Sequence, residues 1–439
     1  MATRLNMFAS LTALLAVGSM LLACTPRDGI TPFSTIDRRE EIRIGEENFE
    51  PTLQARGGRY TLDPEVVSYV EEIGRRLANA SGGKLPWEFA IVNNSLPNAW
   101  SLPGGKIAIN RGLLVSLESE AQLAAVLAHE VAHATNSHAA RAMERGLVIE
   151  ATLRALGFGD SAADVVDSGA LGIQIITARF SQAAEFEADA DGMRYMAEAG
   201  FQLEGALTLQ QSMLREQGSS QGGLTGSHPA SRERIIANRR ILEVLQSAYP
   251  VNSDDGRDRF LRKTRFMRNA EPAYVEYKVA IWELVRGNLE AAHERISAAM
   301  DIENREARFH ALHAEYYERL GEIEAALEEY DTAIRLEPAY HALHQGKGLL
   351  LLRMGRLDEA RGSLAIANAQ LQDAETHEGL GDIAVAQGRL NDAIGHYTLA
   401  SRSRGVAGER AREKLREVEA EALQAEARRS SDSRFQSPN

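Results

Sequence analysis

A pair of small residues, a glycine followed five positions later by an alanine, recurs four times in the last third of the chain. The pairs are Gly287/Ala292, Gly321/Ala326, Gly355/Ala360 and Gly388/Ala393, at spacings of 34, 34 and 33 residues. A period of this length is typical of a solenoid in which every repeat contributes two helices. Four repeats exceed the roughly three that are needed to bury a continuous core. Residues 273–405 are therefore predicted to form a helical repeat array.

One repeat carries a more specific signature. Residues 321–338 (GEIEAALEEYDTAIRLEP) resemble the turn and second helix of a tetratricopeptide repeat. The resemblance implies a concave surface for a protein partner or client, with structural support of the preceding domain as the alternative role. Residues 406–429 are predicted to be a capping helix, and residues 430–439 a disordered tail.

Three histidines of this array share one repeat position: His310, His344 and His377. That position is usually filled by a large packing residue. We expect these rings to pack between helices, and a second metal site is the alternative.

The charge balance restricts the class of partner. The chain has 49 Lys and Arg against 62 Asp and Glu, a formal net charge of −13. Because affinity for nucleic acid comes mainly from neutralising phosphates, no nucleic-acid partner is expected. The single cysteine excludes an intrachain disulfide and a cysteine-ligated zinc cluster.

That cysteine lies at the end of an apolar N-terminal segment. Residues 1–23 have the pattern of a signal peptide, although an uncleaved membrane anchor is the alternative. Leu-Leu-Ala-Cys24 resembles a bacterial lipobox, which implies lipidation of Cys24 and a tether over residues 24–36. Thr25, rather than Asp, follows the cysteine. By resemblance to Gram-negative lipoproteins, this implies an outer-membrane anchor and a chain that faces the periplasm.

The chemistry is concentrated in an apolar segment with helical spacing. His129 and His133 lie four residues apart, so both rings emerge from one helix face and can bind the same cation. Glu130 lies beside the first histidine and can reach a water without binding the metal. This His-Glu-x-x-His pattern is typical of zinc metalloproteases.

A catalytic zinc needs three protein ligands and an open position. His138 is predicted to point away from the centre, because it lies about 140° around the helix from His133. Glu185 and Asp189 are four residues apart on a predicted second helix. Glu185 can be the third ligand, and Asp189 can accept a hydrogen bond from a ligand ring. From spacing alone, a solvated acidic helix face is the alternative.

Together these motifs resemble the BepA-like periplasmic metalloproteases, which are gluzincins related to the CAAX prenyl endopeptidases. The likeness covers residues 37–250 and includes further motifs at residues 98–105, 109–113 and 227–229 and at Arg234. It implies that zinc is bound by His129, His133 and Glu185. It also implies that Glu130 is the general base and that Asp189 supports a ligand.

The expected mechanism follows from charge. Zinc polarises the scissile carbonyl and lowers the pKa of water toward 7, and Glu130 accepts a proton during the attack. His228, which follows the Gly/Ser-rich loop 218–227, is the candidate donor to the oxyanion. Alternatively, His228 binds zinc at the open position and keeps the enzyme latched.

Substrate is expected to pair with an edge strand at Lys106–Asn110, with an internal strand as the alternative. The predicted fold is mainly α with a small β-sheet: a zincin-like domain (37–250), a linker (251–272) and the α-solenoid. The predicted function is a zinc endopeptidase that degrades misfolded or misassembled envelope proteins, with outer-membrane assembly machinery as a possible partner of the repeats. The alternative is a periplasmic chaperone or assembly scaffold in which proteolysis is minor.

Overall fold

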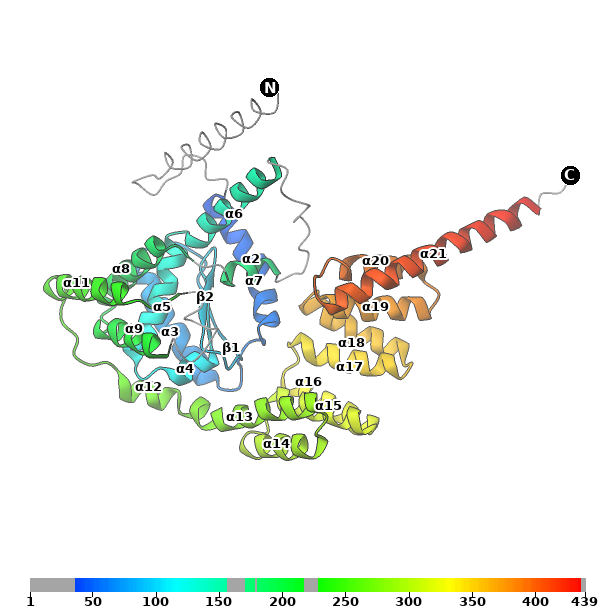
Figure 1. Ribbon diagram of the computed structural model, residues 1–439. Coiled ribbons are helices and arrows are strands. Elements are labelled where there is room, and N and C mark those ends of the chain that lie inside the picture. The colour runs from blue at the N-terminus through cyan, green and yellow to red at the C-terminus, as the bar shows by residue number, and fades with distance from the viewer. Residues whose placement is uncertain (1–35, 156–169, 178–179, 217–227, 436–439) are drawn as a thin grey trace, which may run out of the picture. The chain divides into compact units, whose positions relative to one another are not determined.

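Three short strands lie inside the N-terminal half of the molecule (Figure 1). The computed structural model describes residues 36–155, 170–177, 180–216 and 228–435. The strands are β1 (Glu88–Val92), β2 (Ala99–Leu102) and β3 (Lys106–Asn110), in the spatial order β1-β3-β2. β3 pairs in parallel with β1 and antiparallel with β2.

The prediction that Lys106–Asn110 is an edge strand is wrong. All five residues of β3 are buried, and the strand pairs on both sides. The turn at Gly104 and Gly105, whose φ angles are +76° and +84°, folds β2 back onto β3. Such angles favour glycine, which lacks a Cβ atom. The outer strands of the described sheet are β1 and β2.

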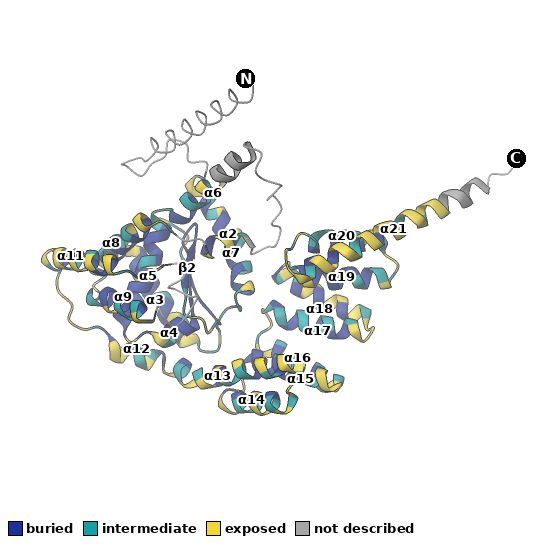
Figure 2. Ribbon diagram, viewed as in Figure 1, coloured by how far each residue is buried: buried dark blue, intermediate teal, exposed yellow. Residues whose placement is uncertain are grey.

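Helices surround this sheet. Their bounds are α2 (Arg38–Ala55), α3 (Pro64–Ala80), α4 (Arg111–Ser116), α5 (Glu120–Thr135), α6 (His138–Ala155), α7 (Ala170–Thr177), α8 (Gln182–Glu198), α9 (Glu204–Glu216), α11 (Arg232–Ala248) and α12 (Arg257–Lys263). Helix α5 begins at Ser119, whose hydroxyl accepts a hydrogen bond from the Gln122 amide. It packs against α3, α8, α9 and β2, so almost its whole length is buried (Figure 2).

Helix α8 approaches α5 closely at one glycine. A Cβ atom on Gly192 would lie 3.1 Å from the carbonyl carbon of Ala128 and 3.1 Å from the amide nitrogen of His129. Since close-packed interiors have little free space, this glycine allows the acidic face of α8 to reach the histidines of α5.

The expected linker, residues 251–272, is largely helical. It contains α12 and the start of α13 (Arg265–Arg286). Phe260 and Met267 are fully buried and belong to the same apolar core as the sheet and α5. Because the segment is polar in composition, the sequence did not indicate that these two residues would be buried.

The C-terminal part consists of successive helix pairs. They are α13 with α14 (Leu289–Ile302), α15 (Ala307–Leu320) with α16 (Ile323–Leu336), α17 (His341–Arg353) with α18 (Leu357–Gln370), and α19 (Ala374–Ala386) with α20 (Leu390–Ala400). The repeating glycines all have φ between +69° and +79° in the turns between paired helices. The repeating alanines are all fully buried. The fold class predicted from the sequence is therefore confirmed.

The three equivalent histidines are buried in the array. Ring nitrogens of His310 and His344 lie 2.9 Å from the carbonyl oxygens of Asn304 and Pro338, and His377 lies beside His396. Among the described residues, the one cluster with metal-ligand geometry lies in the N-terminal half. These contacts are typical of side chains that pack between helices.

Two termini remain. Helix α21 (Val406–Phe435) continues beyond the expected end of the capping helix at residue 429, and residues 436–439 lie outside the described part. The predicted signal peptide, Cys24 and nearly all of the tether also lie outside it. No described helix is both long enough and apolar enough to span a membrane.

We predict that Gly192→Ala lowers the free energy of unfolding by about 1–3 kcal/mol, because the added methyl group overpacks the contact between α8 and α5. Urea unfolding measures this change. The control is Gly362→Ala in α18, where an added Cβ meets no atom within 4 Å. That variant should gain up to about 1 kcal/mol from helix propensity. Equal unfolding midpoints for both variants would contradict the close packing of α8 on α5.

Candidate metal centre

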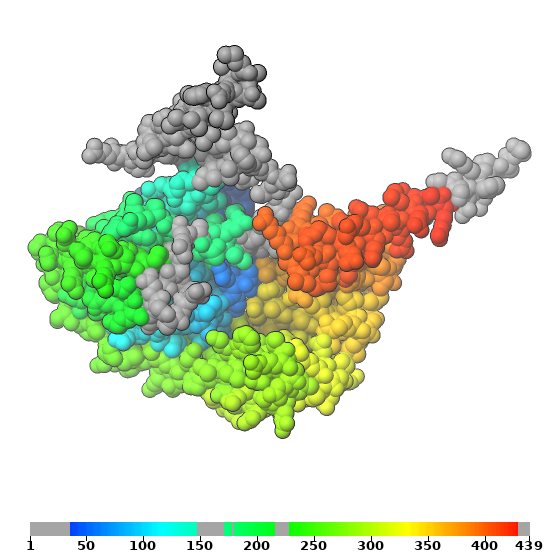
Figure 3. Space-filling model, viewed as in Figure 1, coloured from blue at the N-terminus to red at the C-terminus, as the bar shows by residue number. Residues whose placement is uncertain are grey.

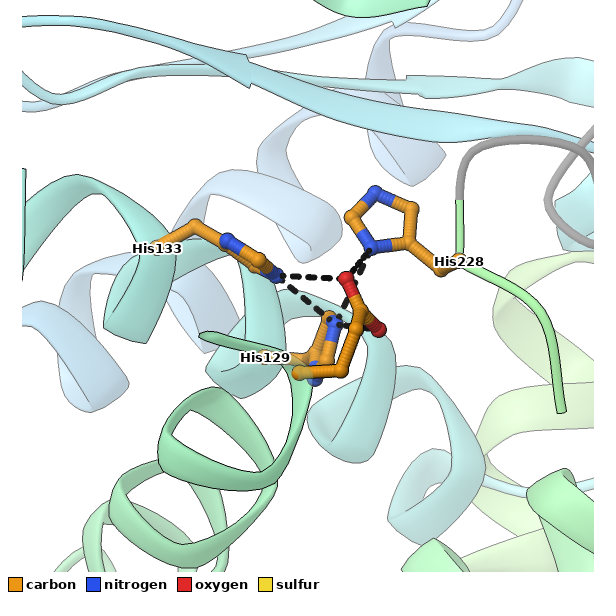
Figure 4. A group of neighbouring side chains, drawn as sticks. His129, His133 and His228 are labelled. Atoms are coloured by element: carbon orange, nitrogen blue, oxygen red, sulfur yellow. Dashed lines mark hydrogen bonds and ion pairs between the residues drawn. The ribbon is translucent and has the colours of Figure 1, made fainter. Parts of the chain in front are cut away.

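Two helices and one loop supply the residues of the centre. Helix α5 carries His129, Glu130 and His133, and α8 carries Glu185. Helix α8 begins at Ser181, whose hydroxyl accepts a hydrogen bond from the Ala184 amide, so Glu185 lies in its first turn. His228 lies just before α11. Figure 4 shows the three imidazole rings turned toward one another.

The ligand atoms converge on one point. The Nε2 atom of His129 lies 3.0 Å from Nε2 of His133 and 3.2 Å from Nδ1 of His228. The carboxylate oxygens of Glu185 lie 2.9 Å from Nδ1 of His228 and 3.5 Å from the Nε2 atoms of His129 and His133. One ligand atom from each of the four residues lies within 4.8 Å of the others.

This donor set fits zinc. Around an ion with bonds of about 2.0–2.1 Å to nitrogen, neighbouring ligand atoms of a tetrahedron lie about 3.4 Å apart. The observed separations of 2.9–3.5 Å are close to that value. Three ring nitrogens at such distances compete for protons, whereas one cation can accept a lone pair from each. Imidazole and carboxylate ligands are those that catalytic zinc sites use.

Asp189 and Arg234 support the ligands from behind. Oδ1 of Asp189 lies 3.0 Å from Nδ1 of His129, which leaves Nε2 directed into the cluster. The Arg234 guanidinium donates to both oxygens of Asp189, at 2.7 and 2.8 Å, and its Nη1 lies 2.7 Å from Glu185 Oε2. It also donates to the carbonyl oxygen of Pro229, next to His228. One buried cation therefore orients ligands from three segments.

The electrostatics favour positive charge at this point. Burial opposes ionisation of Asp189, but Arg234 and His129 lower the pKa of its carboxyl to about 2. Burial likewise opposes protonation of His129, but Asp189 and Glu185 raise its pKa to about 10. Burial lowers the pKa of His133 well below its usual value, and the neighbouring rings of His129 and His228 act in the same direction. The carboxylates thus stabilise a cation, which can be a proton on His129 or a bound metal.

His138 lies outside the ligand cluster, as predicted, but it does not point away from His133 as the helical extrapolation implied. Its Nδ1 atom lies 2.9 Å from Nδ1 of His133, and its Nε2 atom lies 3.0 Å from a Glu187 oxygen. The extrapolation failed because α5 ends at Thr135 and the chain turns at Ser137, whose φ is +54°. His138 therefore orients His133, and sequence reasoning missed this role.

Glu130 is almost completely buried beside the ligands. Its Oε2 atom accepts a hydrogen bond of 3.0 Å from the Ser101 hydroxyl on β2. Its Oε1 atom lies 3.5 Å from Nε2 of His228 and has no hydrogen-bond partner among the described residues. One carboxylate oxygen is thus held in place while the other is available to a water. Ser101 lies within a motif that the sequence analysis quoted, but its contact with Glu130 depends on the tertiary fold.

The structure brings the predicted site residues together: His129, Glu130, His133, Glu185, Asp189 and His228. His228 fills the corner of the cluster that a catalytic zinc would leave open to water. Beside it lies a cavity of about 40 Å³, lined by Glu130 and by methionines of α8 and α9. That volume accommodates a few waters. The loop expected to move His228, residues 218–227, lies outside the described part.

Comparison with known proteins agrees with this geometry. Residues 64–241 match peptidase family M48, a range that contains all six of these residues. This part of the chain, called the M48 domain below, is similar to M48 peptidases. The resemblance to BepA-like proteases is confirmed by several curated relatives.

Two relatives show the extent of the likeness. The beta-barrel assembly-enhancing protease of Escherichia coli (strain K12) is 27% identical over 270 residues, which cover 57% of this chain and 55% of that protein. The mitochondrial metalloendopeptidase OMA1 of Schizosaccharomyces pombe is 31% identical over 226 residues, which cover 49% of this chain and 64% of that protein. This chain thus spans little more than half the length of the first relative.

Among solved structures, yeast Tom70 is similar at 15% identity and a TM-score of 0.35. The match covers 70% of this chain and 64% of that one.

We predict that Asp189→Asn weakens zinc binding by the M48 domain about 10–100-fold, because the amide cannot orient His129 or pair fully with Arg234. Competition with a zinc chelator measures the affinity. The control is Asp191→Asn, because Asp191 contacts Asn136 and Arg194 instead of a ligand. An equal loss of affinity in both variants would contradict the supporting role of Asp189.

Proposed function

We propose that this chain is a zinc endopeptidase, tethered to the outer membrane and facing the periplasm, that degrades misfolded or misassembled envelope proteins. The observation that carries the proposal is the convergence of four ligand side chains beside a buried carboxylate, Glu130. In this proposal His129, His133 and Glu185 hold zinc, and Asp189 with Arg234 orients them. Lipidation of Cys24 would provide the tether.

The substrate class is supported by the relatives. The curated name beta-barrel assembly-enhancing protease describes a protease that enhances beta-barrel assembly, and its match extends over 57% of this chain. The helical repeats that follow the M48 domain are suited to protein contacts. We therefore infer that the repeats contact clients or outer-membrane assembly machinery.

In the proposed hydrolysis each residue of the centre has a separate role. Zinc, when bound, would supply a Lewis acid that polarises the scissile carbonyl and makes water more acidic. Glu130 would accept the proton of the attacking water and pass it to the leaving amine. Ser101 would keep the carboxylate in the orientation that this transfer needs. Burial of Glu130 excludes bulk water and strengthens its interaction with the developing charges.

The outer strand β2 is suited to hold the substrate. It carries Ser101, so its main chain passes beside Glu130. An extended peptide that adds to this strand would be bound through main-chain hydrogen bonds, with little dependence on its sequence. This mode requires an unfolded segment, which agrees with misassembled proteins as substrates.

A second candidate function is a chaperone or assembly scaffold that acts mainly through the repeats. The position of His228 favours it, because Nδ1 of that ring completes a four-residue ligand set. A zinc held in this way has no open position for water. We infer that the resting chain is latched by His228 and that proteolysis requires this ring to move.

Glu130→Gln tests the proposed hydrolysis. The amide cannot accept a proton, so we predict that cleavage of an unfolded outer-membrane protein falls at least about 100-fold, within the range attributed to general base catalysis. Because Glu130 is not a proposed ligand, the variant should retain one zinc per chain. The assay compares purified wild-type and variant proteins by gel electrophoresis and metal analysis. Equal cleavage by both proteins would contradict the role of Glu130.

His228→Ala distinguishes the latch from the oxyanion donor. If His228 latches the centre, removal of the ring opens a ligand position and raises the rate of cleavage several-fold while zinc remains bound. If His228 stabilises the oxyanion, the rate falls about 10²–10³-fold. We predict the increase, measured with the same unfolded outer-membrane protein. A fall in rate with full zinc occupancy would contradict the latch.

A further inference from the structure

A second, larger cavity lies where the M48 domain meets the repeats. Its volume is about 840 Å³, and its walls come from residues 56–57, 93–95 and Arg111 on one side and from α13, α15 and α17 on the other. Figure 3 shows the surface of the repeats in yellow-green to red. The Gln54 side chain of α2 donates to the carbonyl oxygen of Ala339 at 2.9 Å. Ligand sites commonly have volumes of about 300–1,000 Å³.

Most of the buried charges around this cavity have partners. Arg111 is bonded to Glu271, Ser95 and Asn93. Arg308 is paired with Glu306 and Glu337 and donates to the carbonyl oxygen of Gly57. The contacts of Arg111 with Glu271 and of Arg308 with Gly57 join the two parts of the molecule. Together these partners leave the two guanidinium groups without spare affinity for a ligand.

Arg56 differs from them. Within the described part of the chain, no hydrogen bond or ion pair of its guanidinium group is found, and its Nε atom is buried without a partner. Burial lowers the pKa of Arg56, and no carboxylate offsets this effect. A half-buried arginine of this kind bears the desolvation cost of a charged group without the usual compensation. It lines the cavity and is available to an anion.

The far wall of the cavity has the opposite character. Glu315, Glu318 and Glu375 line it together with Arg319 and Arg353, and Arg353 forms an ion pair with Glu318. Burial raises the pKa of Glu315, the charge of Arg319 opposes this effect, and the charges of Glu318 and Glu375 add to it. Burial and neighbouring acids also raise the pKa of Glu375. The three carboxylates of this wall outnumber its two arginines, so the wall still favours a cation, whereas Arg56 favours an anion.

Aromatic and aliphatic side chains form the remaining surface. Tyr277, Tyr330 and Tyr340 line the cavity together with Leu312, Leu343 and Leu349. Such a lining binds apolar side chains, and tyrosine adds hydrogen-bonding capacity at low entropic cost. A ligand that matches the whole cavity must carry both charges and apolar groups.

We propose that this cavity binds an extended segment of a client protein in which an acidic side chain pairs with Arg56, apolar side chains pack on the tyrosines, and a basic side chain faces Glu315 and Glu375. The inference rests on the proposed function only in taking an unfolded protein as the client. A nucleic acid or a simple anion would leave the acidic wall unmatched, and a peptide can satisfy both walls.

Binding can be tested without cleavage. The probe is a fluorescent peptide, capped at both ends, that carries one aspartate and one lysine separated by leucine and phenylalanine. Binding to full-length protein with Glu130→Gln is followed by fluorescence anisotropy. Adding Arg56→Gln should weaken binding by roughly tenfold or more, the value of a charge-assisted hydrogen bond. Arg286→Gln, at an exposed position outside the cavity, is the control and should leave binding unchanged.

Exchanging the charges of the peptide aspartate and Arg56 distinguishes a direct ion pair from a general structural effect of the substitution. Replacing the aspartate of the peptide by lysine should abolish binding to the protein that retains Arg56, and Arg56→Glu should restore it. Equal binding of the original peptide by the protein with Arg56, by Arg56→Gln and by Arg56→Glu would overturn the proposal. Failure of Arg56→Glu to restore binding of the lysine peptide would overturn it too. Binding only by a peptide with a free carboxyl end would overturn it as well, by assigning the cavity to chain termini. Cleavage by wild-type protein is assayed separately, so the proposed protease can fail while this site stands.

Discussion

The whole metal centre depends on a balance between buried carboxylates and buried positive charge. Asp189 and Glu185 place two carboxylates in the interior between α5 and α8, where an uncompensated charge is costly. Arg234 supplies one positive charge to both of them. The high pKa of His129 shows that the pair still attracts a further positive charge, which a divalent cation can provide in place of the proton. Binding of a metal ion at this centre and the packing of α8 on α5 would therefore be parts of one equilibrium.

Buried contacts also connect the M48 domain to the repeats. Phe260 and Met267 belong to the core of the M48 domain although they lie in the segment that leads into the array. Asn93, which directly follows β1, donates to the buried carboxylate of Glu306 in the second repeat. A buried polar network of this kind specifies one arrangement, because every member loses its partner if the contact shifts. A client bound by the repeats would thus be presented to the protease by a structured junction.

Local rules predicted much of this molecule and failed where tertiary contacts decide. The repeats were predictable because each turn requires a positive φ, which glycines such as Gly321 provide. The pairing of His129 with His133 followed from helical spacing. The contact of His138 with His133 was missed because the helix ends before His138, and periodicity does not reveal a change of chain direction. β3 (Lys106–Asn110) was predicted to be an edge strand because its alternation of apolar and polar residues does not reveal which strands lie beside it. The contact of Ser101 with Glu130 could not be predicted either, because it depends on the tertiary fold.

The central claim is that His129, His133, Glu185 and His228 together hold one zinc in the resting chain. X-ray absorption at the zinc edge of the purified full-length protein tests it most directly. We predict four light-atom ligands at about 2.0–2.1 Å, with the multiple-scattering pattern of three imidazoles. A first shell with two imidazoles and an ordered water would contradict the resting arrangement. A chain that binds no zinc would contradict the metal centre itself.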